Sequence, residues 1–236
     1  EKDSVDKCME LARSQIQNGN IDLAIESISK AIDIDPTDSD LYANRSLGYQ
    51  HVEDYLNAIS DNLKSLELIQ NYPEKNEKHK QFIQPIKDAT SKLLNTLGVE
   101  DIEQGEYESA VIKFTKTIEL DQDNFDAHRH RSICKDFLGD KNSAIEDMKK
   151  AIEIDPNDGV AFYTLGVIYT GNGDNELAID AYNKCLEIDP NIVNAYVNRG
   201  NRKHDISDLK GACEDWKKAA ELGDEDAPEM LRKYCQ

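Results

Sequence analysis

Hydrophobic residues recur along this chain with the spacing of amphipathic helices that come in pairs. Phe162, Leu165 and Tyr169 fall on one face at helical spacing. A Gly-Asn-Gly turn at residues 171–173 then breaks the helix, because glycine readily adopts the backbone conformations that a tight turn requires. A second apolar face follows, and Pro190 ends it, since the residue before a proline avoids the helical conformation. The pattern predicts two helices joined by a short turn.

The same pair of helices recurs through the chain. One small residue marks the start of each second helix, at Ala24, Ala58, Ala110, Ala144, Ala178 and Ala212. Neighbouring alanines in this series are 34 residues apart, except that Ala58 and Ala110 are 52 apart, so 18 residues are inserted between them. A fixed period of this length predicts helical repeats that stack on one another.

Residues 159–192 resemble a tetratricopeptide repeat. The signature positions of that family favour an aromatic residue, Leu, Gly, Tyr, Ala, an aromatic residue, Ala and Pro. The chain has Phe162, Leu165, Gly166, Tyr169, Ala178, Tyr182, Cys185 and Pro190 at these positions. Only Cys185 departs from the pattern, as a small residue where alanine is usual. The resemblance implies an all-α fold, a right-handed α-solenoid of helix–turn–helix repeats.

The signature alanines divide the chain, residues 1–236, into six repeats of a single solenoid. The predicted repeats cover residues 5–38, 39–72, 91–124, 125–158, 159–192 and 193–226. An insertion occupies 73–90, and we expect a capping helix at 227–236, since the last repeat of a solenoid needs a cap with a polar outer face. The second repeat departs from the family pattern at Asn62, where a large apolar residue is expected. The stretch from Ala212 to Cys235 resembles bacterial tetratricopeptide repeat proteins, which favours a bacterial source.

The insertion at 73–90 is richer in lysine than the rest of the chain. Pro85 suits the first turn of a helix that runs into the third repeat. The segment is either a solvated linker or elongated repeat helix, or it is a docking loop, because insertions in solenoids tend to lie on the binding face.

The net charge and the lack of catalytic motifs reduce the number of functions that the chain could have. The net charge of −19 disfavours nucleic acid and anionic membranes as ligands, and it favours either solubility alone or a basic partner. No apolar run reaches the ~18 residues of a membrane-spanning helix, so we expect no membrane insertion. His128 and His130 point to different sides of a helix and cannot share a metal. Because the chain has no nucleophile–base set, phosphate-binding loop or zinc motif, we expect no catalytic residues, no cofactor and no metal site.

The cysteines offer one structural hypothesis. Cys134 and Cys185 fall at buried helical positions, where inert thiols are the default. Cys213 begins the second helix of the last repeat and Cys235 ends the cap, so antiparallel packing of these helices brings the two thiols together. If they are bridged, the compartment is oxidising, and the protein is periplasmic or secreted. If they are reduced thiols, the protein is cytoplasmic.

The resemblance also implies a binding face. In tetratricopeptide repeat proteins the first helices of successive repeats line a concave groove, where peptides bind. In the second repeat the groove positions are Asp40, Ala43, Asn44, Leu47, Gln50 and His51. The residues that we predict to bind a peptide are Asn44, Arg129, His130, Tyr163, Asn198, Asn201 and His204.

Three repeats carry related triplets centred on Arg45, Arg131 and Arg199. Their asparagines suit hydrogen bonds to an extended peptide, or else the triplets tie neighbouring repeats together. We predict a non-catalytic protein–protein interaction scaffold that binds an extended peptide or a partner helix in the groove. The alternatives are a self-assembling, homo-oligomeric module and an accessory subunit of a cell-envelope enzyme or secretion complex.

Overall fold

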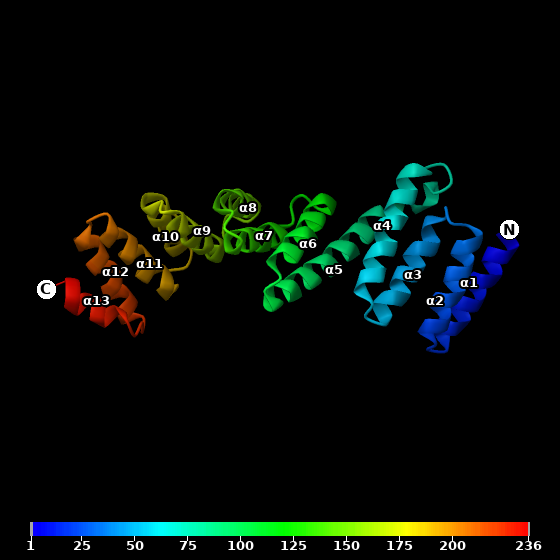
Figure 1. The fold of residues 1–236 in the computed structure, drawn as a ribbon, viewed down its shortest axis with the longest axis horizontal. Coiled ribbons are helices and arrows are strands. Elements are labelled where there is room, and N and C mark those ends of the chain that lie inside the picture. Colours follow the sequence, from blue (N-terminus) through cyan, green and yellow to red (C-terminus); the bar gives the residue numbers. More distant parts are fainter. Residues whose placement is uncertain (1, 236) are drawn as a thin grey trace. The chain divides into compact units, whose positions relative to one another are not determined.

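Helices alone build the described part of the chain, residues 2–235 of a computed structural model (Figure 1). The helices are α1 (Lys2–Gln17), α2 (Ile21–Ile34), α3 (Ser39–His51), α4 (Tyr55–Asn71), the 3₁₀ helix η1 (Glu77–Phe82), α5 (Ile83–Gln104), α6 (Tyr107–Leu120), α7 (Phe125–Phe137), α8 (Lys141–Ile154), α9 (Gly159–Asn172), α10 (Asn175–Ile188), α11 (Val193–Asp205), α12 (Leu209–Glu221) and α13 (Ala227–Tyr234). The fold is an all-α solenoid of helical repeats, which confirms the predicted fold class.

Polar residues in the turns fix where the helices begin and end. Asp54, Asp140, Asp158 and Asp208 each stand just before a helix, and each carboxylate accepts a backbone N–H of the first turn. Such caps satisfy amide groups that have no partner inside the helix. After α9, Gly173 has a φ of +85°, a left-handed conformation that a side chain would strain.

Large aromatic residues of the second helices pack on glycines of the first helices. Tyr182 on α10 is fully buried, and a Cβ added to Gly166 on α9 would come within 2.5 Å of its ring. Trp216 on α12 meets Gly200 on α11 in the same way, at 2.8 Å. Glycine therefore allows each pair of helices to approach closely around a buried ring, as the family signature requires.

The chain divides into two compact units. Unit 1 comprises the residues up to Leu97 together with Glu119–Asp121, and unit 2 comprises Gly98–Ile118 and the residues from Gln122 onward. Helices α1 to α4 lie side by side in unit 1, and the helices from α7 to α13 follow one another through unit 2 (Figure 1). The six repeat boundaries and their union into one solenoid stay predictions.

The insertion at 73–90 is mostly helical. It contains η1, and α5 begins at Ile83 with Pro85 in its first turn. Residues 83–90 therefore lengthen the first helix of the next pair, in agreement with the elongated-helix interpretation. Asn76 is fully buried and holds the insertion to the start of α3, because its Oδ1 accepts hydrogen bonds from the backbone N and Oγ of Ser39, at 3.2 and 2.9 Å.

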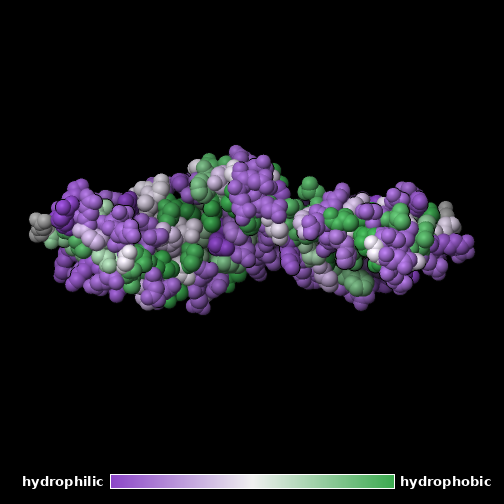
Figure 2. All heavy atoms as spheres, turned by 90° about the horizontal axis from the view of Figure 1, so that it is seen from below, coloured by the Kyte–Doolittle hydropathy of each residue, from purple (hydrophilic) through white to green (hydrophobic). Residues whose placement is uncertain are grey.

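The predicted cap is helix α13, which packs against α12; the final residue of the predicted range, Gln236, lies outside the described residues. Hydrophilic residues occupy much of the face shown in Figure 2, with hydrophobic residues between them. Within residues 2–235, no helix combines the length and the apolar character that a membrane crossing needs.

Candidate functional site

Six of the seven predicted peptide-binding residues lie on three helices of unit 2. They are Arg129 and His130 on α7, Tyr163 on α9, and Asn198, Asn201 and His204 on α11. All six side chains are half-buried. The seventh, Asn44, is exposed on α3 of unit 1. The first helix of each pair therefore supplies every predicted residue, and Asn44 belongs to a different unit from the other six.

Tyr163 and Asn198 form a direct link between α9 and α11. The Asn198 Nδ2 donates a hydrogen bond to the Tyr163 Oη at 3.3 Å. The Tyr163 ring also lies against the Tyr182 ring, with 6.0 Å between centroids. Burial raises the pKa of Tyr163 above its ordinary value, so the phenol stays protonated. The Tyr163 hydroxyl and the Asn198 amide form a polar patch, and the Tyr182 ring packs beside it.

Arg129 and His130 form the basic part of the predicted site. The Arg129 Nη2 lies 3.2 Å from the His130 Nε2 and 3.3 Å from the Asp126 Oδ1, and the guanidinium sits over the Phe125 ring. The His130 ring packs on Phe114. Burial, and then the positive charge of Arg129, lower the pKa of His130, so this imidazole is neutral near pH 7. Arg129 is therefore the positively charged group of this patch, and it is paired with the exposed carboxylate of Asp126.

Asn201 and His204 make contacts that hold unit 2 together. The Trp216 Nε1 donates a hydrogen bond to the Asn201 Oδ1 at 3.0 Å. The His204 ring contacts the rings of Trp216 and Tyr234, at centroid distances of 5.8 and 4.6 Å. These contacts join α11 to α12 and α13. A role for Asn201 and His204 in binding stays a prediction.

The three arginine-centred triplets tie helices together through their arginines. Arg131 on α7 makes two hydrogen bonds to the Asp147 carboxylate on α8, of 2.8 and 2.6 Å, and a third to the Thr115 Oγ1 on α6, of 3.1 Å. The equivalent sets are Arg45 with Asp61 and Ser29, and Arg199 with Asp215 and Asn183. The arginines therefore follow the second interpretation, in which the triplets connect neighbouring repeats.

Asp147 is the most strongly held carboxylate of these sets. Lys135 also reaches it, at 2.8 Å, and the His128 Nδ1 lies 3.7 Å away. Burial alone would raise the pKa of Asp147, but the contacts from His128, Arg131 and Lys135 lower it well below its ordinary value. The carboxylate is therefore ionised throughout the physiological pH range.

A disulfide joins Cys213 on α12 to Cys235 directly after α13, with 5.8 Å between the Cα atoms. It links the cap to the last helix pair, at the place where the sequence allowed either a bridge or two thiols. Burial raises the pKa of the Cys134 and Cys185 thiols to about 11. Thiols with such a pKa are poor nucleophiles at neutral pH.

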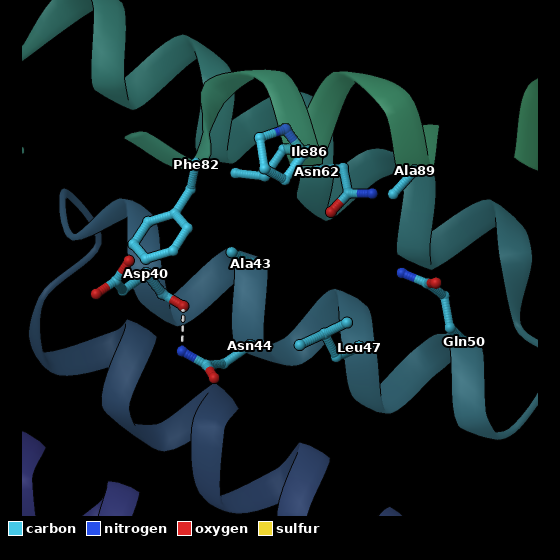
Figure 3. A pocket seen from close by; sticks show the side chains of 10 residues that line it. Asp40, Ala43, Asn44, Leu47, Gln50, Asn62, Phe82, Ile86 and Ala89 are labelled. Atoms are coloured by element: carbon cyan, nitrogen blue, oxygen red, sulfur yellow. Dashed lines mark hydrogen bonds between the residues drawn. The ribbon is translucent and has the colours of Figure 1, made fainter. Parts of the chain in front are cut away.

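Sequence reasoning missed a pocket of about 340 Å³ in unit 1 (Figure 3). One wall carries groove positions predicted for the second repeat, and the other carries residues of η1 and α5. The lining residues are Asp40, Ala43, Asn44, Leu47, Gln50, Asn62, Phe82, Pro85, Ile86 and Ala89. Two features of the sequence lie at this pocket but did not predict it, namely the insertion and the departure from the family pattern at Asn62.

One group of side chains has the composition of a metal site. Ligand atoms of Asp38, Asp40 and His79 lie within 4.8 Å of one another. The His79 Nε2 is 2.8 Å from the Asp40 Oδ2, and its Nδ1 is 2.7 Å from the Ser39 Oγ. These contacts account for the position of each ring nitrogen, so we assign no metal to the group.

Comparison with known proteins identifies the repeats. Family models described as the tetratricopeptide repeat match residues 8–38, 131–158 and 159–192. The solved structure of YrrB, described as a tetratricopeptide repeat protein with an unusual peptide-binding site, is 20% identical in sequence. That match covers 89% of this chain and 99% of YrrB, with a TM-score of 0.59.

Two further solved structures share the fold. MamA from Desulfovibrio magneticus RS-1, from residue 41 to its end, is 23% identical over 78% of this chain and 94% of that chain, with a TM-score of 0.54. The C-terminal part of a repeat-containing protein from Cytophaga hutchinsonii is 22% identical over 94% of this chain and 80% of that chain, with a TM-score of 0.52. At these identities the likeness is one of fold.

Proposed function

The chain is a tetratricopeptide repeat protein, and we propose that it is a non-catalytic scaffold that holds an extended segment of a partner protein on unit 2. The proposed surface consists of Arg129 on α7, Tyr163 on α9 and Asn198 on α11. Tetratricopeptide repeats support many unrelated functions, so the proposal rests on these side chains and not on the fold.

The observation that carries the proposal is the hydrogen bond between Asn198 and Tyr163. It places an amide and a phenol, groups that both donate and accept hydrogen bonds, on one surface across two helices. An extended peptide exposes its backbone N–H and C=O groups, which such side chains recognise. Arg129 adds a cation that suits a carboxylate of the partner. The YrrB structure, described as having a peptide-binding site, is a precedent for peptide binding on this fold.

Two alternatives differ in the partner. In the first, the same surface binds another copy of the chain, and the protein is a homo-oligomer. In the second, the protein is an accessory subunit of a cell-envelope enzyme or secretion complex, which the disulfide favours, because disulfides persist in oxidising compartments.

Site-specific photocrosslinking tests the proposal. A photoreactive phenylalanine analogue would replace Val167, an exposed residue on α9 about one turn from Tyr163, so that the Tyr163 phenol is kept. A second variant would carry the analogue at Lys184, an exposed residue on α10 that serves as the control. We expect illumination in native extract to link another protein at position 167 and not at position 184. The same products at both positions would overturn the proposal, and links only between copies of the chain would favour self-assembly.

A further inference from the structure

The pocket in unit 1 is mainly apolar and is built from three helices and η1. Ala43 and Leu47 come from α3, Asn62 from α4, Phe82 from η1, and Pro85, Ile86 and Ala89 from α5. Figure 3 shows Ala43 and Leu47 of α3 below Phe82, Ile86 and Ala89, with Asn62 drawn at the level of Ile86 and Ala89. Its volume of about 340 Å³ is in the range of sites that take a small ligand or a single large side chain.

Asn62 explains why space remains here. In each of the other predicted repeats, the equivalent position carries a large side chain that is at most 1% exposed. These side chains are Ile28, Phe114, Met148, Tyr182 and Trp216. Asn62 is as deeply placed, at 4% exposed, but it is smaller and polar. The second repeat thus lacks the buried large side chain that fills the other repeats.

The amide of Asn62 also lacks a partner. Its Nδ2 is buried and has no hydrogen bond. A buried polar group without a partner is unfavourable, and most such groups in native proteins are satisfied by protein, water or ligand. Because Asn62 lines the pocket, a ligand with a hydrogen-bond acceptor on an apolar body would satisfy it.

The pocket shares residues with a second hollow, which is acidic. Asp40 and Asn44 line both this pocket and a neighbouring hollow of about 290 Å³. The charged residues of that hollow are Asp6, Glu10, Asp38 and Asp40, against Arg13 and Lys78. Asp40 also faces His79. The excess of carboxylates favours a ligand with a cation beside its apolar group, in keeping with the net charge of −19.

We propose that this pocket binds a tyrosine side chain of a partner protein, at a site where a lysine or arginine adjoins the tyrosine. The ring packs between Leu47 and Ile86, and the phenol oxygen accepts a hydrogen bond from the Asn62 Nδ2. The neighbouring cation faces Asp40. Tyrosine combines an aromatic body with a terminal acceptor, whereas phenylalanine and leucine have no acceptor. This inference goes beyond the proposed function, since it concerns unit 1 and stands whether or not unit 2 binds a peptide.

Fluorescence anisotropy with the full chain tests the inference. The probe is a labelled glycine–serine peptide with a central Tyr-Lys pair, compared with Phe-Lys and Tyr-Glu versions. We expect the Phe-Lys peptide to bind about tenfold more weakly, as one hydrogen bond to a buried group predicts. We expect the Tyr-Glu peptide to bind more weakly than the Tyr-Lys peptide, because Asp40 and the neighbouring carboxylates repel its glutamate. Equal affinity of the Tyr-Lys and Phe-Lys peptides would overturn the assignment of Asn62, and no binding at about 1 mM would overturn the site.

Two substitutions separate the hydrogen bond from the space. Asn62→Ala removes the donor without adding bulk to the pocket, so it should bring the Tyr-Lys peptide down to the affinity of the Phe-Lys peptide. Ala89→Phe fills the pocket from α5 and should abolish binding of both. Ala89 is half-buried at the lining, and circular dichroism would establish that both variants fold. Unchanged binding by a folded Ala89→Phe variant would place the peptide elsewhere.

Discussion

Asp147 shows at the scale of a single residue how this chain uses buried charge. Its side chain is 8% exposed, and Arg131, which is 15% exposed, holds it with two hydrogen bonds. Removing one member of such a pair leaves the other charge buried without compensation, and that is costly. Asp147 therefore contributes to stability because its carboxylate neutralises the charges of Arg131 and Lys135.

We expect Asp147→Ala to lower the free energy of unfolding by about 3 kcal/mol, because Arg131 and Lys135 lose their common anion. Urea unfolding followed by circular dichroism measures the change. Glu153→Ala is the matched control, since this exposed residue pairs with Lys150 and its loss should cost less than about 0.5 kcal/mol. Equal effects of the two substitutions would contradict a special role for Asp147.

The lowered pKa of Asp147 also predicts how stability depends on pH. In the unfolded chain this carboxyl takes up a proton near pH 4, whereas in the folded chain it stays ionised to lower pH. Its contribution is complete above about pH 5 and is lost as pH falls towards the folded-state pKa. The wild type should therefore lose Tm more steeply between pH 5 and pH 3 than Asp147→Asn does. Parallel Tm curves for the two proteins would contradict this.

Much of the residue-scale site lay beyond sequence reasoning. The family resemblance predicted that Tyr163 and Asn198 lie on the binding face, and that call stays a prediction. Arg131 and Asp147 are on different helices, and their pairing follows only from how those helices pack. Asn62 stood out as a departure from the family pattern, yet the sequence did not show whether neighbours would close the space. The insertion supplies the opposite wall, and its course was left open between linker, helix and loop.

At the scale of elements, turn residues fix where each helix begins and ends, and contacts between aromatic rings and glycines hold each pair of helices together. These residues recur with the period of 34, and for this reason the period was enough to predict the fold class. The cap is a different case. Helix α13 is only Ala227–Tyr234, a length at which an isolated helix is not stable. Its order depends on contacts with α12, including the Cys213–Cys235 disulfide and the tilted contact between the rings of Tyr234 and Trp216.

Replacing both Cys213 and Cys235 by alanine should lower stability by roughly 3 kcal/mol, as the chain-entropy estimate gives for a loop of this length. Hydrogen exchange should rise more in α13 than in α10, because α13 loses its link to α12 as well as overall stability. Mass spectrometry after alkylation in denaturant without reductant should find three modified cysteines in the wild type, namely Cys8, Cys134 and Cys185. Five modified cysteines would show that the bridge is absent.

At the scale of the whole molecule, the chain offers two surfaces of different character on two units. The patch on α7, α9 and α11 is polar and carries Arg129, whereas the pocket beside α3 is apolar and shares residues with an acidic hollow. The net charge of −19 acts on both, because it draws basic partners by a long-range attraction that salt screens.

Affinity capture from native extract with quantitative mass spectrometry tests the scaffold function most directly. The baits are the wild type, an Arg129→Ala, Tyr163→Ala, Asn198→Ala triple variant, and a Lys150→Ala, Lys184→Ala, Lys218→Ala control on exposed positions of the second helices. We predict a protein that the wild type and the control retain and the triple variant, still helical by circular dichroism, does not. The same proteins on all three baits would contradict binding at the α7, α9 and α11 surface.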